Sequence, residues 1–128
     1  CLVAQGLLRE LNPAEAYRAA IKSFARHHRG KPWDAELPHF ERILSGQVGE
    51  LPEDKIGSGG YVMETLTASL WCLLNSPGFA EAVLKAVNLG GDRDTTGCVT
   101  GGLDGLHQWS VSVKHGTPWS SWDSRCLA

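Results

Sequence analysis

The amino-acid sequence predicts an all-α fold, and three observations support this prediction. Apolar residues recur at helical spacing through most of the 128 residues, no stretch of five or more residues alternates between apolar and polar, and glycine and proline separate the periodic segments. A chain of this length is typical of one domain with its own core. We therefore expect residues 1–128 to form a single domain, an irregular, orthogonal helix bundle.

The first two predicted helices lie near the N-terminal end of the sequence. A helical pattern of leucine and valine covers residues 2–11. Asn12, Pro13 and Glu15 then provide a capping side chain, a proline at the first helical position and a glutamate three residues after the cap. These signals predict a second helix that begins at residue 13 and ends at Gly30.

The middle of the chain divides into a loop and two helices. Residues 31–60 are rich in glycine and proline, which predicts a loop-rich connection with at most one short helix, around residues 39–44. Between residues 62 and 74 apolar positions recur at helical spacing with few charges, so this helix should be central to the core. Apolar positions within residues 79–87 form one face of the next helix, and a glycine pair ends that helix.

Composition excludes several classes of partner. A formal net charge of -2 provides no field that would attract nucleic acid, and no apolar run approaches the length of a membrane span. The four cysteines are far apart and form no CxxC pair, so we expect neither a zinc site nor a disulfide scaffold, but a reduced cytoplasmic protein. The chain begins without an initiator Met, as a portion of a longer protein would.

Two carboxylates directly after the glycine pair are candidates for a metal site. Asp92 and Asp94 would point apart on a regular helix, whereas in a loop that leads into a helix both can converge on one point. A divalent cation relieves the repulsion between them, and oxygen ligands suit Mg²⁺, Mn²⁺ or Ca²⁺, with the hydroxyl of Thr95 as a further ligand. The alternative is that Asp92 caps the helix and Asp94 lies in its first turn, without a metal.

The next segment carries glycines at every fourth position. Gly97, Gly101 and Gly105 would form a bare stripe along one face of a helix, and each costs about 1 kcal/mol in helix propensity relative to alanine. Apolar residues keep helical spacing through the same segment. We therefore predict a helix whose glycine stripe packs closely against another backbone.

Two short motifs almost match the acidic segment. In a calcium-binding EF-hand loop that starts at Asp92, Leu103 would occupy the position of the required glutamate, so that interpretation fails. Asp92, Asp94 and Thr96 also fit the DxDxT pattern of haloacid-dehalogenase-type phosphotransferases. That pattern must follow a buried strand, whereas a helical pattern precedes it here.

A longer resemblance is far more specific. Residues 57–106, GSGGYVMETLTASLWCLLNSPGFAEAVLKAVNLGGDRDTTGCVTGGLDGL, resemble the C-terminal part of the ADP-ribosylglycohydrolase family, including its GGDxDT motif and the glycine-spaced helix after it. Residues 1–30 resemble the family more loosely, as a preceding helical pair. The resemblance implies an all-α, Mg²⁺-dependent fold (Mn²⁺ is the other candidate ion) that hydrolyses the glycosidic bond between ADP-ribose and a protein side chain or small acceptor.

The resemblance also assigns residues to the site. Asp92, Asp94 and Thr95 match late metal ligands of the family, which hold one of two ions beside the distal ribose. The resemblance also implies substrate-binding residues just before the helix of residues 62–74. There Gly59, Gly60 and Tyr61 match a loop that lies near the ligand in the family. The expected partners are therefore ADP-ribose or an ADP-ribosylated protein.

Departures from the family pattern indicate an incomplete site. The family takes its first metal site from an N-terminal half with adjacent aspartates, and this sequence contains no Asp-Asp pair. A histidine-containing motif of the family would precede residue 1, and we interpret the histidines here as exposed or locally bonded; they are His27, His28, His39, His107 and His115. Residues 107–128 form a divergent tail, in which Trp109, Trp119 and Trp122 form a local cluster or contact another chain.

Two hypotheses follow. The first is a C-terminal portion of an ADP-ribosylglycohydrolase that is catalytically incomplete unless another chain supplies the missing half. The second is a non-catalytic binding or oligomeric interaction module derived from that fold. Because helices that pack against the missing half would expose an apolar patch, we expect a homo-oligomer or a complex with a complementing chain.

Overall fold

The fold of the chain is helical, in agreement with the sequence. The computed structural model describes residues 2–27, 30–57 and 59–114, and within these residues it contains α-helices, short 3-10 helices and no strand. The α-helices are α1 (Leu2–Leu8), α2 (Pro13–His27), α3 (Leu37–Leu44), α4 (Val62–Leu74), α5 (Phe79–Asn88) and α6 (Arg93–Lys114). The all-α prediction is confirmed.

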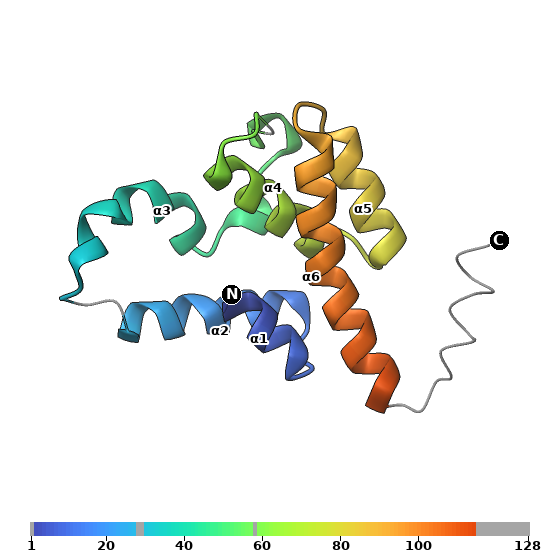
Figure 1. Cartoon of the computed structure of the whole chain (residues 1–128), viewed down its shortest axis with the longest axis horizontal. Helices are drawn as coiled ribbons and strands as arrows, with labels where there is room; N and C mark the ends of the chain where they lie inside the picture. Colours follow the sequence, from blue (N-terminus) through green and yellow to red (C-terminus); the bar gives the residue numbers. More distant parts are fainter. Residues whose placement is uncertain (1, 28–29, 58, 115–128) are drawn as a thin grey trace.

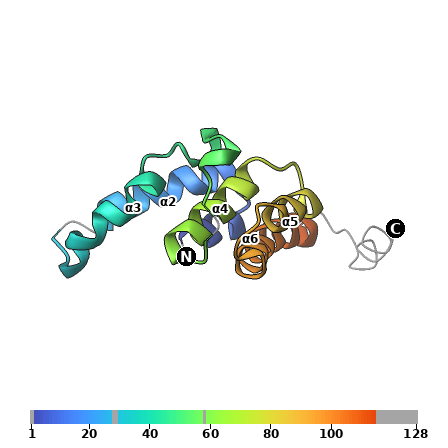
Figure 2. The ribbon, with the colours of Figure 1, turned by 90° about the horizontal axis from the view of Figure 1, so that it is seen from above.

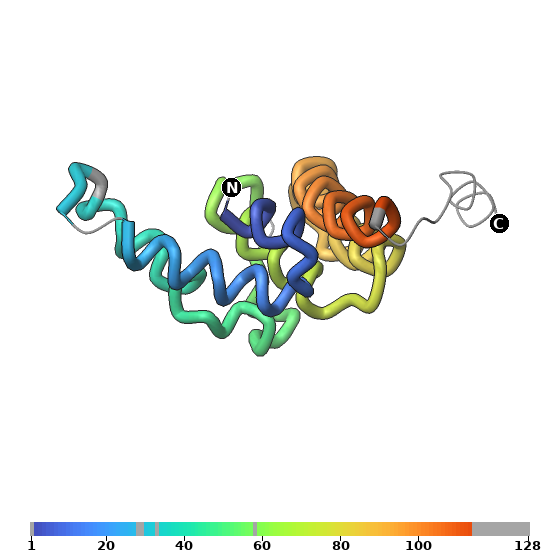
Figure 3. The backbone as a smooth tube through the Cα atoms, turned by 90° about the horizontal axis from the view of Figure 1, so that it is seen from below, coloured from blue at the N-terminus to red at the C-terminus, as the bar shows by residue number. Residues whose placement is uncertain are grey.

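The longest helix, α6, connects the other parts of the bundle. It contacts α4 and α5 through its first half and α1 further along (Figure 1). Figure 2 shows α6 nearly end-on with α5 beside it. On the other side, α2 and α3 extend away from this group (Figure 3). None of the helices in the described part of the chain is both long and apolar enough to cross a membrane.

The first two helices, α1 and α2, pack closely against each other. The Asn12 side chain accepts a hydrogen bond from the Glu15 backbone N–H at 2.9 Å, which is the predicted cap of α2. A Cβ atom on Gly6 would lie 2.9 Å from the Cβ of Ala16, so only glycine allows this approach. This contact could not be predicted from the sequence, because a lone glycine in a helical pattern does not reveal its partner.

The loop-rich segment contains more helical turns than its composition predicted. Besides α3 it forms three 3-10 helices: Pro32–Glu36, Val48–Glu50 and Glu53–Lys55. Proline in the first turn begins both the first of these and α3. Two hydrogen bonds from α4 hold the later turns, since Trp71 Nε1 donates to the Leu51 carbonyl at 2.8 Å and Asn75 Nδ2 to the Gly49 carbonyl at 3.0 Å.

Helix α4 is the core helix that the sequence predicted. Eight of its thirteen residues are buried, so it is enclosed on more than one face. Leu70 and Cys72 are almost fully buried, and Trp71 is 5% exposed. Lys85 from α5 lies over the Trp71 ring, with its Nζ 5.1 Å from the ring centroid.

The glycine stripe on α6 packs closely against α5, as predicted, and side chains of α5 are the atoms nearest to it. A Cβ atom on Gly97 would lie 3.2 Å from Val87 Cγ1, and one on Gly101 would lie 3.5 Å from Val83 Cγ2. The nearest atoms are therefore branched side chains. The stripe forms a groove that receives the apolar face of α5.

Candidate metal and ligand site

The candidate site begins at the α5–α6 junction, residues 89–95. Gly90 and Gly91 both have positive φ, 82° and 57°, a conformation that other residues rarely adopt, and they reverse the chain after α5. The Asp92 carbonyl accepts the Thr96 N–H at 3.2 Å, so Asp92 is the N-cap residue of α6. Its side-chain Oδ1 accepts the Thr95 N–H at 3.3 Å.

Capping therefore occupies one oxygen of Asp92. Asp94 and Thr95 lie in the first turn of α6, and both side chains are exposed, whereas Asp92 is half-buried. The junction thus presents the carboxylate and hydroxyl oxygens of these three residues beside the positive end of the α6 dipole. Capping and metal binding are compatible at Asp92, because they use different oxygens.

A second loop meets Asp92 from the other side. The glycine loop, Gly57 and Gly59 to Tyr61, leads into α4, and Gly60 has φ 83°. A Cβ atom on Gly60 would lie 3.3 Å from Asp92 Oδ2. The structure thus brings together Gly60 and Asp92, which the sequence analysis had assigned separately to ligand and metal binding.

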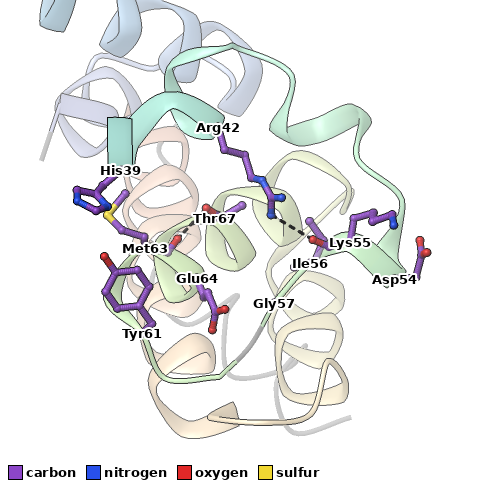
Figure 4. Close-up of a pocket in the computed structure, with 10 residues that line it drawn as sticks. All are labelled: His39, Arg42, Asp54, Lys55, Ile56, Gly57, Tyr61, Met63, Glu64 and Thr67. Atoms are coloured by element: carbon purple, nitrogen blue, oxygen red, sulfur yellow. Dashed lines mark hydrogen bonds between the residues drawn. The ribbon is translucent and has the colours of Figure 1, made fainter. Parts of the chain in front are cut away.

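The same loop forms one wall of a cavity of about 500 Å³ between α3 and α4. His39, Met63 and Tyr61 lie close together at one end, and Tyr61 is 55% exposed (Figure 4). At the other end Arg42 Nη1 donates a hydrogen bond to the Lys55 carbonyl at 3.3 Å. The cavity offers an aromatic and a thioether side chain beside charged groups, and its volume is in the range of small-molecule sites.

Glu64 lies on the wall between this cavity and the junction. Its Oε2 accepts the Gly59 N–H at 2.9 Å. Glu64 was not among the predicted site residues, although it occupies the third position of α4, where a glutamate often reaches back to the helix start. The spacing of Tyr61 and Glu64 was the available signal.

The donor atoms at the junction are oxygens, which suit a hard cation, but they are too few to complete its coordination shell. In residues 2–27, 30–57 and 59–114, no group of three or more His, Cys, Asp or Glu side chains could hold a metal ion. Mg²⁺ demands octahedral coordination by oxygen and keeps several waters. Asp92, Asp94 and Thr95 would therefore form only part of its coordination shell.

Below the junction, α6 buries a polar stripe. Thr96 and Thr100 are fully buried and Asp104 is 4% exposed, and each has a side-chain oxygen without a hydrogen-bond partner among the described residues. Burial raises the pKa of Asp104, while nearby His107 opposes the shift. Because Thr96 is buried and α5 precedes Asp92, the phosphotransferase interpretation fails.

The histidine interpretation holds for two residues and fails for one. His27 Nδ1 lies 2.7 Å from the Ser23 carbonyl, and His39 is exposed beside Glu36. His107 is half-buried, and its buried Nδ1 has no hydrogen-bond partner in the described part of the chain, so it is neither exposed nor locally bonded. His28, His115, Trp119 and Trp122 lie outside the described residues.

Comparison with known proteins places this helical fold with its acidic, glycine-bounded junction in a class of hydrolases. The profile of the ADP-ribosylglycohydrolase family matches residues 1–108, and the chain belongs to that family. The match includes residues 31–56, beyond the resemblance described above, and it ends near the start of the divergent tail. In the structure, α6 continues past this point to Lys114.

Two curated relatives are hydrolases of one type. The ADP-ribosylarginine hydrolase Tri1 of Serratia proteamaculans (strain 568) is 41% identical over 78 residues, which are 60% of this chain and 20% of that protein. Tri1 of Pseudomonas putida (strain GB-1) is 41% identical over 63 residues, 49% of this chain and 17% of that protein. The chain thus spans about a fifth of the length of these relatives. No solved structure matches it.

Proposed function

We propose that this chain forms the late half of an ADP-ribosylglycohydrolase site, with Asp92, Asp94 and Thr95 as ligands of one Mg²⁺ or Mn²⁺ ion. The observation that carries this proposal is the contact between Gly60 and Asp92, because it joins a backbone suited to close ligand approach with a carboxylate oxygen that capping leaves free. Family membership and the two Tri1 relatives support the substrate class, an ADP-ribosylated side chain.

Each residue has a distinct part in this proposal. Asp92 and Asp94 neutralise the cation, and the hydroxyl of Thr95 adds a neutral oxygen. When bound, the ion fixes ribose hydroxyls and polarises the oxygens next to it. Gly59 and Gly60 let the ligand approach the backbone, and the exposed ring of Tyr61 provides an apolar face at the mouth of the cavity.

We further propose that the chain is catalytically incomplete alone. Glycoside hydrolysis needs an acid or base carboxylate placed against the scissile bond as well as a positioned substrate. In the described residues the junction offers two aspartates and no third acidic, histidine or cysteine group near enough to form a metal-binding cluster with them. The remaining part of the family fold would supply the other groups.

Calorimetric titration tests the binding half of the proposal. ADP-ribose is titrated into the purified chain with Mg²⁺, then with EDTA, and Asp94→Asn serves as the variant because Asp94 is exposed and makes no cap. We expect binding that requires Mg²⁺ and is lost in the variant. Absence of binding in every condition would leave the junction as helix-capping structure. Release of ADP-ribose from ADP-ribosylarginine by the chain alone would refute incompleteness.

The second candidate function is a non-catalytic interaction module, and an apolar groove favours it. A cavity of about 230 Å³ opens between α1, α2, α3 and α4, and almost all of its lining is apolar. Phe24 and Phe40 meet there, with ring centroids 6.4 Å apart. Because the chain spans about a fifth of the length of its relatives, we propose that the occupant is the remaining part of the family fold.

Sedimentation velocity distinguishes the possible occupants of this groove. A complementing chain predicts a monomer alone and a heterodimer after mixing with the earlier part of a Tri1 relative, weakened by Phe40→Asp. Concentration-dependent self-association that Phe40→Asp removes would indicate a second copy instead. A monomer under all conditions would reject the interaction module.

A further inference from the structure

Glu64 of α4 contacts the glycine loop at more than one point. Its Oε2 accepts the Gly59 N–H at 2.9 Å. A Cβ atom on Gly59 would lie 2.7 Å from that oxygen, and one on Gly57 would lie 3.0 Å from Oε1. Both glycines are therefore packed on the carboxylate: a Cβ at Gly59 would displace Oε2, and a Cβ at Gly57 would require Oε1 to move slightly.

The position of Glu64 in its helix is shared with two other glutamates. Glu15 in α2 and Glu81 in α5 also stand three residues after the N-cap. All three gain the same interaction with a helix dipole. Glu81 Oε2 lies 3.1 Å from where a Cβ on its N-cap Gly78 would stand, but Glu15 and Glu81 are exposed, whereas Glu64 is half-buried (Figure 4) and accepts the Gly59 N–H. The bond to Gly59 lies two residues before the N-cap Tyr61, further back than in an ordinary capping box.

The glycine loop that Glu64 holds also contacts Asp92. Gly60 follows Gly59 directly, and its Cα faces Asp92 Oδ2, 3.3 Å from where a Cβ would stand. The other oxygen of Asp92 is held by the Thr95 N–H at 3.3 Å. The orientation of the Asp92 carboxylate is thus restricted at one oxygen by a hydrogen bond. At the other oxygen it is restricted by contact with the loop backbone to which Glu64 is hydrogen-bonded.

We propose that Glu64 is a positioning residue for the candidate metal site: it holds the glycine loop against Asp92 and so fixes the orientation of Asp92 Oδ2. This inference rests on the proposed metal-binding function, although the link from Glu64 to Asp92 is tested without metal. Glu64 does not itself bind the ion. Supporting residues of this kind typically change metal affinity by about 10- to 100-fold when removed.

The test compares two substitutions at residue 64. One changes the charge of the side chain, and the other changes whether the side chain is long enough to reach the Gly59 N–H. Glu64→Gln keeps the length of the side chain and an oxygen that accepts the Gly59 N–H. Glu64→Asp keeps the charge and the dipole interaction but is one methylene too short to reach Gly59. Glu81→Asp makes the same change at the same helix position in α5 and serves as the matched control, and circular dichroism checks the fold of each variant.

Two measurements are made on each variant. The first records the amide resonances of Gly59, Gly60 and Thr95 by NMR in metal-free buffer. The second measures Mn²⁺ affinity by electron paramagnetic resonance. We expect Glu64→Asp to move all three resonances and to weaken Mn²⁺ binding about tenfold or more. In Glu64→Gln the amide resonances and the Mn²⁺ affinity should stay closer to the wild-type values. Glu81→Asp should change neither the resonances nor the affinity.

Each outcome decides a separate claim. Resonances of Gly60 and Thr95 that stay in place in Glu64→Asp would overturn the positioning role, whatever the metal affinity. Loss of Mn²⁺ affinity in Glu64→Gln without loss in Glu64→Asp would assign the effect to charge and also overturn it. A wild-type chain that binds no Mn²⁺ would refute the proposed metal site, while the NMR comparison still shows whether Glu64 controls Asp92.

Discussion

Gly60 and Asp92 meet in space although they lie on different loops, and a single added Cβ atom at Gly60 would stand 3.3 Å from Asp92 Oδ2. This relationship joins the start of α4 to the start of α6, so two helix N-termini open on the same place. Both dipoles favour negative charge there, as do the exposed backbone N–H groups of the first turns.

Substitutions at Asp92 separate its two roles. Asp92→Asn keeps a capping oxygen for the Thr95 N–H but removes the charge, so stability should stay near that of the wild type while Mn²⁺ binding is lost. Asp92→Ala removes both, and we expect unfolding free energy to fall by about 0.5–2 kcal/mol as well. Urea denaturation and Mn²⁺ titration measure the two effects. If Asp92→Asn binds Mn²⁺ like the wild type, Asp92 is a cap only.

A pair of glycine substitutions tests the packing of α1 on α2. Gly6→Ala places a methyl group 2.9 Å from Ala16 Cβ and 3.0 Å from its Cα, and we expect a loss of about 1–3 kcal/mol. Gly102→Ala is the control, since nothing lies within 4 Å of its added Cβ in the described structure, and it should raise stability by about 0.5–1 kcal/mol. Thermal unfolding compares them. Equal effects at both positions would contradict the close approach.

Asp104 should make stability depend on pH. Burial raises its pKa above the ordinary value of 3.8, so the folded state holds the proton more tightly than the unfolded state. The stabilising contribution is complete below that ordinary pKa and disappears as pH rises through the folded pKa. Asp104→Asn stays neutral, so its stability relative to the wild type should increase with pH over this window. Denaturation at a series of pH values from about 3 to 7 measures it, and a constant difference would contradict the shift.

The two described cysteines should differ sharply in reactivity. Burial raises the pKa of Cys72 to about 11, with Lys85 opposing the shift, and its side chain is fully buried. Cys98 is free and exposed. In a Cys1→Ser, Cys126→Ser background, a disulfide reagent at neutral pH should modify Cys98 rapidly and Cys72 only after unfolding, because the thiolate is the nucleophile. Rapid reaction of two thiols in the folded chain would contradict the burial of Cys72.

Helix positions were predictable because local chemistry sets them. The Asn12 cap, the apolar spacing of α4 and the glycine pair after α5 act within a few residues, so the sequence displays them directly. The second half of α6 was less clear, since the sequence after Leu106 loses the family pattern while the helix continues to Lys114.

Contacts between distant segments were not predictable in the same way. The glycine stripe of α6 signalled a close neighbour, but spacing alone does not tell whether a backbone or a row of branched side chains fills it, and Val83 and Val87 of α5 do so. The contact between Gly60 and Asp92 depends on how α4, α5 and α6 cross. Glu64 was missed because its partner Gly59 precedes the helix in which it lies.

The two loops of the candidate site also have a consequence for inheritance. The glycine loop, α4, α5 and the α5–α6 junction come from one uninterrupted stretch of the chain, residues 57–95, and the contacts that link Glu64, Gly59, Gly60, Asp92 and Thr95 are made within that stretch. A recombination event that joins or divides genes outside this stretch leaves both loops together, and one between residues 64 and 92 separates Glu64 from Asp92. The cation half of such a site can therefore pass between proteins as a single coding segment.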